Sequence, residues 1–572
     1  MLTYSFDDAG SSTLYEHLYR CIKNDILSGT IAPREKLPSK RSFAKNLSVS
    51  TVTIENAYGM LLDEGYIYSI PKKGYYVSDI AKTAAAIPAS HSYSSRSATE
   101  IPQSAAAPDS EISRNQNALS SDSEDKASSS RFSYVEDAAR PFSQPFSENV
   151  LRSKPYFADF VSNQTTPDKF PFSTWVRLLR EIIHDRKEEL MINSPSGGIP
   201  ELQEAICDYL YQFRSMKVSS EQIIIGAGTE YLYSLLIQLL GRDKQFAVEN
   251  PGYRKISLIY EKNGVRCSFI PMDHQGVRVD ALNKSGADVI HISPSHHFPT
   301  GIITPINRRY ELLSWAAEAD SRYIIEDDYD SEFRLSGKPI PSLQSIDVIE
   351  KVIYINTFTK SLASTIRISY MILPPHLLKK FHRELSFYSC TVSNFEQYTL
   401  ARFLRDGYFE KHINRMRKYY KNQRDTILSC IRKNPRAAGI RITEENAGLH
   451  FLIHFPSGLT DDEIISRAEK RGIRISALTQ YDLSDESSDN PELIPADSAD
   501  PCSASVSSGP SASVSSGPSE VPAGSVRPKP SSASAVSRAS SETDHTLVVN
   551  YSGLEPEIIP EAVDLLIRSI TE

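Results

Sequence analysis

Apolar residues recur with a helical period in three stretches near the start of the chain. The first is 14–27, where apolar positions return every three or four residues until Gly29 ends the pattern. The stretches 39–47 and 51–63 repeat this spacing, and Gly65 follows the second of them. The residues of 51–63 that we expect to face inward are Val52, Ala57, Tyr58, Leu61 and Leu62.

A short alternating segment follows these three predicted helices. Residues 66–70 and 75–77 alternate like strands on either side of Pro71-Lys-Lys-Gly74, which predicts a small hairpin. Ser39 stands where the second helix needs an N-cap. Helix, turn, helix and hairpin together form the outline of a winged helix-turn-helix, an α+β domain.

Positive charge is concentrated in one part of this region. Residues 31–53 carry Arg34, Lys36, Lys40, Arg41 and Lys45 against Glu35 alone, a local charge of +4. The whole of 1–79 is near neutral, so the positive charge is concentrated on one face of the domain. This favours phosphate contacts, with the third helix in the major groove of double-stranded DNA. A three-helix protein-binding module with a solvated basic face remains the alternative.

The segment LPSKRSFAKNLSVSTVTIENAYGMLLDEGYIYSIPKKGYYV resembles the GntR-type winged helix. The resemblance implies DNA contacts at Arg41, Thr51, Thr53 and Gly74. Thr51 replaces the usual arginine, and Glu55 stands where a basic residue is common, so we expect weaker phosphate contacts or an unusual operator. The full predicted set of DNA-binding residues is Ser39, Lys40, Arg41, Ser50, Thr51, Thr53, Lys72, Lys73 and Gly74.

From about residue 150 the pattern changes to short apolar runs that alternate with helix-like segments. The runs 323–325 and 352–355 each end in polar residues, and 309–319 has a helical pattern. Such alternation predicts βα units and a mainly parallel sheet, whose ligands lie beyond the carboxyl ends of the strands.

Candidate chemistry stands at those strand ends. Asp327 and Tyr329 follow the first run, and Lys360 follows the second. A lysine there can form a Schiff base, and a carboxylate can pair with a protonated pyridine nitrogen. Arg367 suits a phosphate group. Each residue alone also has a structural explanation, Asp327 as a helix cap, and Lys360 and Arg367 as solvated surface.

A glycine-containing turn adds to this set. Residues 226–230 read Gly-Ala-Gly-Thr-Glu between a predicted strand and a predicted helix, where backbone N–H groups make an anion site. Gly228 alone is equally well explained as a turn residue. Lysine, carboxylate, arginine and anion loop together indicate pyridoxal 5'-phosphate.

Four segments carry a second resemblance. ENPGYRKI, SPSHHFPTG, IIEDDYDSEFR and NTFTKSLASTIRISYMILP are similar to fold-type I aminotransferases, and more closely to the MocR, or GabR-type, regulators, in which a GntR-type domain precedes that α/β fold. The resemblance implies homodimers with composite sites, in which the DNA-binding domain packs on the partner subunit. It implies that Lys360 forms the Schiff base, Asp327 bonds the pyridine nitrogen, Tyr329 the ring hydroxyl, Tyr253 stacks on the ring, and Thr357, Thr359, Arg367 and the Gly228-Thr229-Glu230 loop hold the phosphate.

One departure bears on activity. Aminotransferases carry an arginine for the substrate carboxylate just before a Gly-aromatic pair, whereas this chain has Val548 and Val549 there. Lys255 and Arg474 remain as alternative anion partners. We therefore favour a transcription regulator that senses pyridoxal phosphate or an amino compound. An active aminotransferase with an accessory DNA-binding domain is the alternative, and a dimerisation platform without cofactor is a weaker one.

Composition sets the domain boundaries. The 572 residues are 40% hydrophobic and 23% charged, with a net charge of -8, enough apolar residues for a large core. Ser, Ala and Pro dominate two stretches, and the second contains the tandem octapeptide SASVSSGP. We predict a winged helix at 1–79, a flexible linker at 80–149 and an aminotransferase-like domain at 150–572, with a disordered insertion at about 482–544.

Other features narrow the class of protein. No apolar run approaches the ~20 residues that cross a membrane, and the first residues lack the pattern of a signal peptide. The six cysteines are far apart without a CxxC pair, which predicts neither a metal site nor a disulfide framework. A cytoplasmic protein fits these features best.

Overall fold

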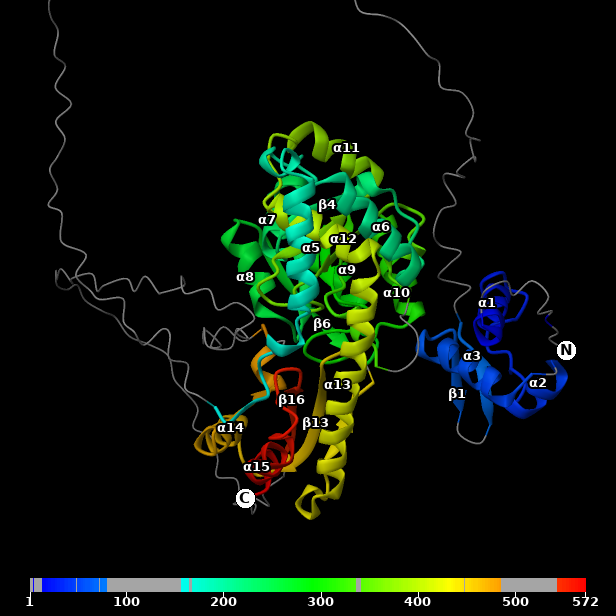
Figure 1. Ribbon diagram of the computed structural model, residues 1–572. Coiled ribbons are helices and arrows are strands. Elements are labelled where there is room, and N and C mark those ends of the chain that lie inside the picture. The colour runs from blue at the N-terminus through cyan, green and yellow to red at the C-terminus, as the bar shows by residue number, and fades with distance from the viewer. Residues whose placement is uncertain are drawn as a thin grey trace, which may run out of the picture. The chain divides into compact units, whose positions relative to one another are not determined.

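The structure is a computed structural model in which the chain forms an N-terminal winged helix and a larger α/β part (Figure 1). The residues that it describes are 4, 13–47, 49–70, 73–79, 156–163, 167–335, 341–446, 448–484 and 543–572. The predicted linker at 80–149 and most of the predicted insertion lie outside the described residues, so those two predictions stay open.

The N-terminal elements follow the predicted order. They are α1 (Leu14–Leu27), α2 (Lys40–Leu47), α3 (Thr51–Asp63), β1 (Ile67–Ile70) and β2 (Gly74–Val77). The two strands pair antiparallel, with Ile67 opposite Val77. Ser39 Oγ accepts a hydrogen bond from the Ser42 backbone at 3.2 Å, as a residue that caps α2 does. The winged helix-turn-helix prediction is confirmed.

The buried face of α3 differs from the predicted one at one end. Val52 is 61% exposed, so its inward placement was wrong, and Ile54 is buried instead. Ile54, Ala57, Tyr58 and Leu61 are spaced three, one and three residues apart, which puts them on one helical face. Val52 precedes that stripe and lies on the side turned to solvent.

The α/β part is built on an eight-stranded sheet with the order β4-β11-β10-β9-β8-β5-β6-β7. The central neighbours from β10 through β6 are parallel, while β11 and β7 run antiparallel to the strands beside them. The strands are β4 (Ile223–Ala227), β5 (Gln245–Asn250), β6 (Arg266–Asp273), β7 (Gly276–Val277), β8 (Val289–Ile292), β9 (Tyr323–Asp327), β10 (Val352–Thr357) and β11 (Ile368–Ile372). The mainly parallel sheet is confirmed.

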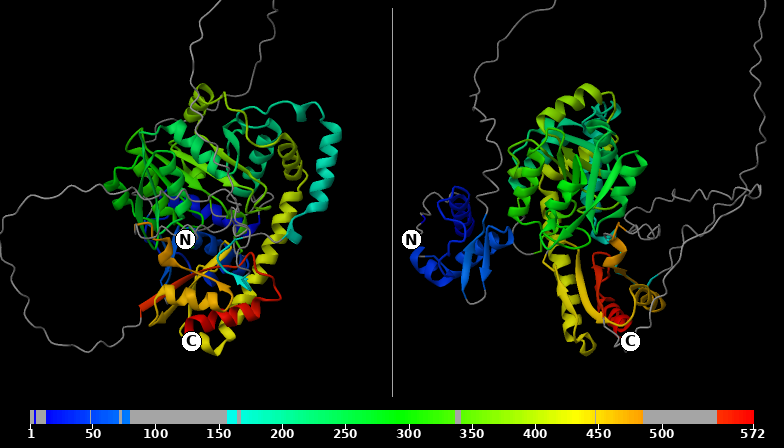
Figure 2. Two further views of the ribbon diagram at one scale, coloured as in Figure 1. Left: turned by 90° about the vertical axis from the view of Figure 1, so that its left-hand side faces the viewer. Right: turned by 180° about the vertical axis from the view of Figure 1, so that it is seen from behind.

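Helices cover both faces of this sheet (Figures 1 and 2). They are α5 (Phe172–Asp185), α6 (Pro200–Arg214), α7 (Thr229–Leu240), α8 (Arg254–Lys262), α9 (Val279–Ser285), α10 (Ile306–Ala317), α11 (Pro375–Glu384) and α12 (Asn394–Arg405). Buried apolar side chains between sheet and helices form the core, including Ile224 and Leu236 on one face and Ile225 and Leu210 on the other. Two covered faces explain why the strand sequences are almost continuously apolar.

A smaller C-terminal sheet follows the long helix α13 (Tyr408–Lys433). Its strands are β12 (Arg441–Thr443), β13 (His450–Ser457), β15 (Ser476–Ala477) and β16 (Thr543–Asn550), in the order β12-β13-β16-β15. The helices α14 (Asp461–Lys470) and α15 (Ile559–Thr571) belong to the same region, and β14 (Ile473–Arg474) pairs with β3 (Ala158–Asp159). Ala477 pairs with Leu547, so strands from both sides of the predicted insertion lie next to each other.

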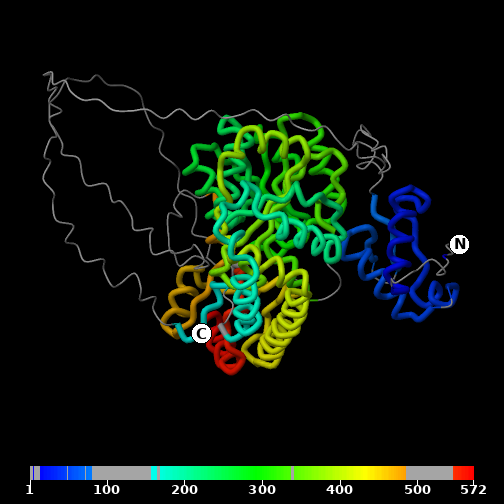
Figure 3. The backbone as a smooth tube through the Cα atoms, turned by 45° about the horizontal axis from the view of Figure 1, so that its top comes forward, coloured from blue at the N-terminus to red at the C-terminus, as the bar shows by residue number. Residues whose placement is uncertain are grey.

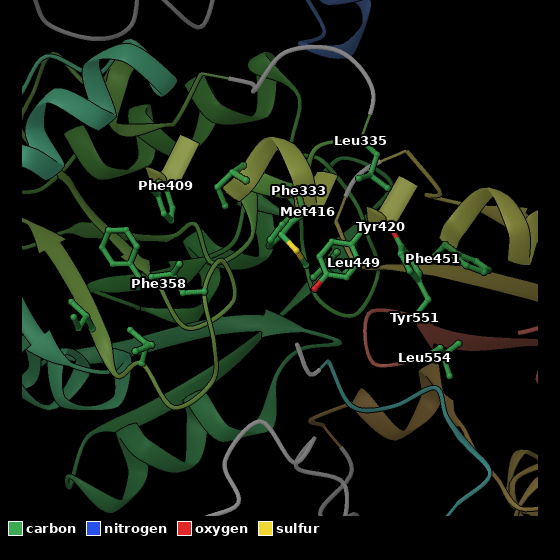
Figure 4. Close-up of a cluster of buried hydrophobic side chains, with 14 of the residues drawn as sticks. Phe333, Leu335, Phe358, Phe409, Met416, Tyr420, Leu449, Phe451, Tyr551 and Leu554 are labelled. Atoms are coloured by element: carbon green, nitrogen blue, oxygen red, sulfur yellow. The ribbon is translucent and has the colours of Figure 1, made fainter. Parts of the chain in front are cut away.

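One apolar cluster joins the two sheets. The view in Figure 3 shows α13 and α15 side by side, and Figure 4 shows the buried side chains around α13. Phe358 and Phe333 come from the large sheet's loops, Met416 and Tyr420 from α13, and Phe451 from the small sheet. Because this packing fixes the small sheet against the large one, residues of both reach the cavity described next.

Candidate functional site

The predicted DNA-binding residues lie mostly on exposed positions of α2, α3 and the hairpin. Arg41, Thr51 and Lys73 are exposed, and Gly74 begins β2 with a φ of 112° that favours glycine. Lys72 lies outside the described residues. The face is thus presented to solvent, as a surface that contacts phosphate groups must be.

Four of those predicted residues have side-chain partners within the domain, Ser39 through the cap of α2 described above. Ser50 Oγ accepts a hydrogen bond from the Thr53 backbone at 3.1 Å and lies 2.8 Å from Thr53 Oγ1, so Ser50 is the N-cap of α3 and Thr53 is its partner. Lys40 Nζ donates to Glu55 Oε1 at 2.7 Å. The acidic residue that departs from the GntR pattern therefore neutralises one lysine of the basic face.

In the large domain, one cavity lies at the carboxyl ends of the parallel strands. Nine of the ten residues predicted to bind a cofactor line it: Thr229, Glu230, Tyr253, Asp327, Tyr329, Thr357, Thr359, Lys360 and Arg367. Gly228, the tenth, does not line the cavity but forms the N-cap of α7 with a φ of 90°. A Cβ at Gly228 would collide with the Arg367 guanidinium, so glycine is what lets that side chain pack on the start of α7.

The inner end of the cavity is organised around Asp327, the last residue of β9. Tyr233 donates its O–H to Asp327 Oδ2 at 2.5 Å, and His291 Nε2 lies 3.4 Å from the same oxygen. The other oxygen, Oδ1, is buried without a hydrogen-bond partner among the described residues. The explanation of Asp327 as a helix cap is therefore wrong, and the carboxylate has one buried acceptor that faces no protein donor in the described part of the chain.

Sequence reasoning missed Tyr233 and His291. Tyr233 lies one helical turn after Thr229, and His291 interrupts the apolar strand β8, so each left a weak signal in the sequence. His291 Nδ1 is 2.6 Å from the Tyr260 hydroxyl, which fixes the ring's orientation. Burial, followed by the nearby Asp327, raises the pKa of Tyr233 well above its ordinary value, so that it stays a donor.

A second buried carboxylate was also missed. Glu249, at the end of β5, accepts a hydrogen bond from the Ser293 backbone at 2.9 Å and lies 3.4 Å from His297 Nε2. Burial raises the pKa of Glu249 to about 8 and lowers the pKa of His297 to about 3. Both side chains therefore line the cavity as neutral groups at mildly acidic pH, which limits the charge around Asp327.

Hydroxyl groups and a guanidinium define the outer end. Thr357 Oγ1 is 2.8 Å from Thr359 Oγ1 and accepts a hydrogen bond from Ser369 Oγ at 2.7 Å. Arg367 comes from just before β11 and lies beside the first turn of α7, whose backbone N–H groups lack partners inside the helix. This arrangement can bind an anion with charge, hydroxyl and backbone donors at once.

Tyr329 and Tyr253 lie on the remaining walls. The Tyr329 hydroxyl is 3.3 Å from His296 Nδ1, and burial raises the pKa of this phenol well above its ordinary value. The Tyr253 ring meets the Phe298 ring edge to face, with 6.1 Å between centroids. An aromatic wall and a phenolic donor suit a flat, polar-substituted ring.

The two alternative anion partners are separated by the structure. Lys255 lines the cavity, whereas Arg474 pairs with Asp159 at 3.3 Å and does not line it. Val548 is buried in a cluster with Leu452 and Tyr481, whereas Asn550, two residues further along β16, lines the cavity. Within the described residues, the cationic side chains of this cavity are Lys255, Lys360 and Arg367.

The described residues contain neither a candidate metal site nor a candidate membrane-spanning helix. No group of three or more His, Cys, Asp or Glu side chains there is arranged to bind a metal ion. None of the helices in the described ranges is long and apolar enough to cross a membrane.

Comparison with known protein families gives two matches along the chain. Residues 14–77 match the bacterial regulatory proteins of the gntR family, and residues 158–488 match aminotransferase class I and II. Both resemblances inferred from the sequence are confirmed.

Individual relatives match over most of the chain. The HTH-type transcriptional regulator YdeL of Bacillus subtilis is 36% identical over 462 residues, 81% of this chain and 88% of that protein. The probable rhizopine catabolism regulatory protein MocR of Rhizobium meliloti is 28% identical over 468 residues, 82% of this chain and 87% of its own. The pyridoxine biosynthesis regulator PdxR of Corynebacterium glutamicum is 25% identical and covers 80% of this chain and 87% of its own.

Solved structures agree on the large domain. The multiple substrate aminotransferase of Thermococcus profundus matches with a TM-score of 0.55 and 21% identity, over 74% of this chain and 93% of that one. At this identity the likeness concerns the fold alone, and it confirms the fold-type I aminotransferase architecture.

Proposed function

Because this chain belongs to the family of HTH-type transcriptional regulators that join a GntR-type domain to an aminotransferase class I and II domain, we propose that it couples DNA binding to pyridoxal phosphate chemistry. The signal is pyridoxal phosphate itself or a primary amine that reacts with it. The observation that carries the proposal is that Lys360, Asp327 and Arg367, from three separate strand ends, line one cavity.

The residues of the cavity fit the cofactor at both ends. Asp327 Oδ1 needs a donor that the described part of the chain does not supply, and a protonated pyridine nitrogen is such a donor. At the outer end, Arg367, Thr357 and Thr359 would hold the phosphate together with the first N–H groups of α7. Tyr253 would cover the ring, and Tyr329 would donate to its hydroxyl.

When bound, pyridoxal phosphate supplies an electrophilic carbon that joins the nitrogen of either Lys360 or an incoming amine. The protein's part is to hold that chemistry in place. Tyr233 and His291 orient the Asp327 carboxylate, while the neutral Glu249 and His297 add no competing charge. An amine effector would compete with Lys360 for that carbon, and an effector with different affinities for two conformations of the regulator would bias one of them.

Lys255 is the proposed partner of an acidic group on the effector. It is on the first turn of α8, close to Tyr253, and it lines the same cavity as Lys360. Because Val548 takes the place of the usual arginine and is packed in an apolar cluster, we do not expect efficient transamination of ordinary amino acids. Single-turnover conversion across an amino-acid panel tests this, since fast conversion would establish the aminotransferase alternative.

We further propose a homodimer, in which the DNA-binding domains are exchanged between subunits through the segment 80–149. Support comes from apolar side chains that the described chain leaves exposed between residues 172 and 192, namely Phe172 and Val176 on α5, and Met191 and Ile192 after its C-terminal end. Exposed apolar area of this kind is typical of protein interfaces. Sedimentation analysis of the full chain at micromolar concentration tests the assembly.

The function itself is tested by a DNA-binding assay beside an absorbance titration. We expect a specific, salt-sensitive shift on the region upstream of the chain's own gene or its neighbours, which Arg41→Ala weakens and pyridoxal phosphate or an amine alters. We also expect a visible absorbance band with pyridoxal phosphate that Lys360→Ala abolishes. Absence of any DNA shift, with or without pyridoxal phosphate, would overturn the regulator proposal, and a band unchanged in Lys360→Ala would overturn the role of the lysine.

A further inference from the structure

The outer end of the cavity already contains a negative charge of the protein's own. Glu230 Oε2 lies 3.1 Å from Arg367 Nη2, and Glu230 Oε1 forms an ion pair with Lys255 Nζ. The side chain of Glu230 is 35% exposed, so solvent reaches this carboxylate while both ion pairs remain formed. Burial opposes its ionisation, but Lys255 and Arg367 outweigh burial and hold the pKa of Glu230 below its ordinary value.

The position of Glu230 places it in competition with a phosphate group. It is the second residue of α7, where a negative side chain interacts favourably with the helix N-terminus. The same helix start and the same Arg367 are the groups that the proposed function assigns to phosphate. A phosphate bound there would share Arg367 with Glu230, and the nearby carboxylate would repel it.

We propose that Glu230 lowers the affinity of the cavity for pyridoxal phosphate by taking the phosphate's place on Arg367 when no phosphate is present. The inference rests on the proposed function, because it assumes that the cavity binds this cofactor. As a consequence, the fraction of the protein that carries pyridoxal phosphate would follow the free concentration of this cofactor. A site whose cations had no internal carboxylate would keep the cofactor longer, as an enzyme that needs permanent loading requires.

The carboxylate has a second effect, on the protein without cofactor. By pairing with two cations it offsets their mutual repulsion, so its removal should lower stability in the absence of pyridoxal phosphate. A purely structural role would produce only this loss. The proposed role produces the loss together with tighter cofactor binding, and the two are therefore separable.

The experiment is an absorbance titration of the full chain with pyridoxal phosphate in the wild type, Glu230→Gln and Glu181→Gln. Glu181 is a matched control, since it is 34% exposed and also lies between two cations, Arg177 at 2.9 Å and Arg402 at 3.2 Å, but it does not line the cavity. We expect about tenfold tighter binding and slower cofactor loss after dilution for Glu230→Gln. Glu181→Gln should bind as the wild type does, while both variants lose some thermal stability without cofactor.

Glu230→Asp provides a second variant that keeps the charge at the helix start but withdraws it by one methylene group. It should fall between the wild type and Glu230→Gln, and it serves if the glutamine variant does not fold. If the wild type binds pyridoxal phosphate and both Glu230→Gln and Glu230→Asp bind it equally or more weakly, this inference alone is overturned. No lysine-dependent band in the wild type or in either variant overturns the inference and the proposed cofactor site together.

Discussion

The two ends of the cavity each hold a carboxylate, and these two carboxylates differ in their burial and in their partners. Asp327 at the inner end has an 8% exposed side chain and is held by a neutral hydroxyl and an imidazole, with one oxygen lacking a partner among the described residues. Glu230 at the outer end is paired with two cations. At the inner end, a ligand could therefore donate to the Asp327 carboxylate. At the outer end, cations of the protein already pair with the Glu230 carboxylate.

This difference has a physical cause. A buried charge is costly unless it is paired, so a carboxylate with one oxygen that lacks a donor among the described residues favours a ligand that brings a charged donor. A half-exposed carboxylate interacts through water and salt, so its pairs exchange at modest cost. We therefore expect the inner end to determine whether the cofactor binds and the outer end to adjust how tightly.

The largest effect should come from Asp327→Asn. The variant keeps the shape and the hydrogen bond from Tyr233 but removes the charge that we propose pairs with the pyridine nitrogen. We expect pyridoxal phosphate to bind about a hundredfold more weakly, measured by absorbance titration. Asp280→Asn, which alters an exposed pair with Arg278, is the control and should bind normally. Equal affinity in Asp327→Asn and the wild type would remove the distinction between the two ends.

The next effect concerns stability and pH at the inner end. The pKa of Glu249 is raised to about 8 by burial, so its stabilising contribution is complete below its ordinary pKa and is lost as the pH rises through about 8. Glu249→Gln is always neutral and should escape this loss, gaining about 2 kcal/mol over the wild type between pH 6 and pH 9. Denaturant unfolding at both pH values measures the gain, and a pH-independent difference would contradict the assignment.

The outer end should respond to salt. Arg367→Gln removes the guanidinium but keeps a polar side chain beside Gly228, and we expect about tenfold weaker binding of pyridoxal phosphate at low salt. The defect should shrink as the salt concentration rises, because the wild type loses the same screened attraction. A defect of constant size from about 50 mM to about 500 mM salt would show that Arg367 acts in a shielded environment like that of Asp327.

The smallest effect should come from Tyr233→Phe. The change removes one O–H donor from Asp327 Oδ2 while His291 remains, so we expect about fivefold weaker cofactor binding. Tyr231→Phe on the same helix does not contact Asp327 through an observed hydrogen bond and is the matched control. A larger loss than that of Asp327→Asn would mean that orientation matters more than charge at this end.

Much of the fold could be read from local patterns. The bounds of α1 and α3 and the hairpin after them agree with the periodic positions, because a helix or strand with one buried face repeats its apolar residues along the chain. The polar residues after β9 and β10 were predicted to meet because carboxyl ends of parallel strands share one edge. Asp327 and Lys360 do line the same cavity.

The site's internal contacts were less accessible. Tyr233 and Asp327 are 94 residues apart in sequence, and their hydrogen bond depends on how α7 lies over the sheet. The choice of Lys255 over Arg474 depends likewise on which strands and helices border the cavity. Periodicity indicates that a side chain faces inward, but not which distant side chain it meets there.

The sequence by itself therefore determined the order of the two domains, the elements of each, and the residues at the strand ends that carry the candidate chemistry. It could do so because these features depend on neighbours along the chain. Only the tertiary structure decided that Asp327 keeps one buried oxygen without a donor among the described residues, that Ile54 rather than Val52 is buried, and that Glu230 lies between Lys255 and Arg367. These outcomes depend on burial and on distances between segments far apart in sequence, which packing alone sets.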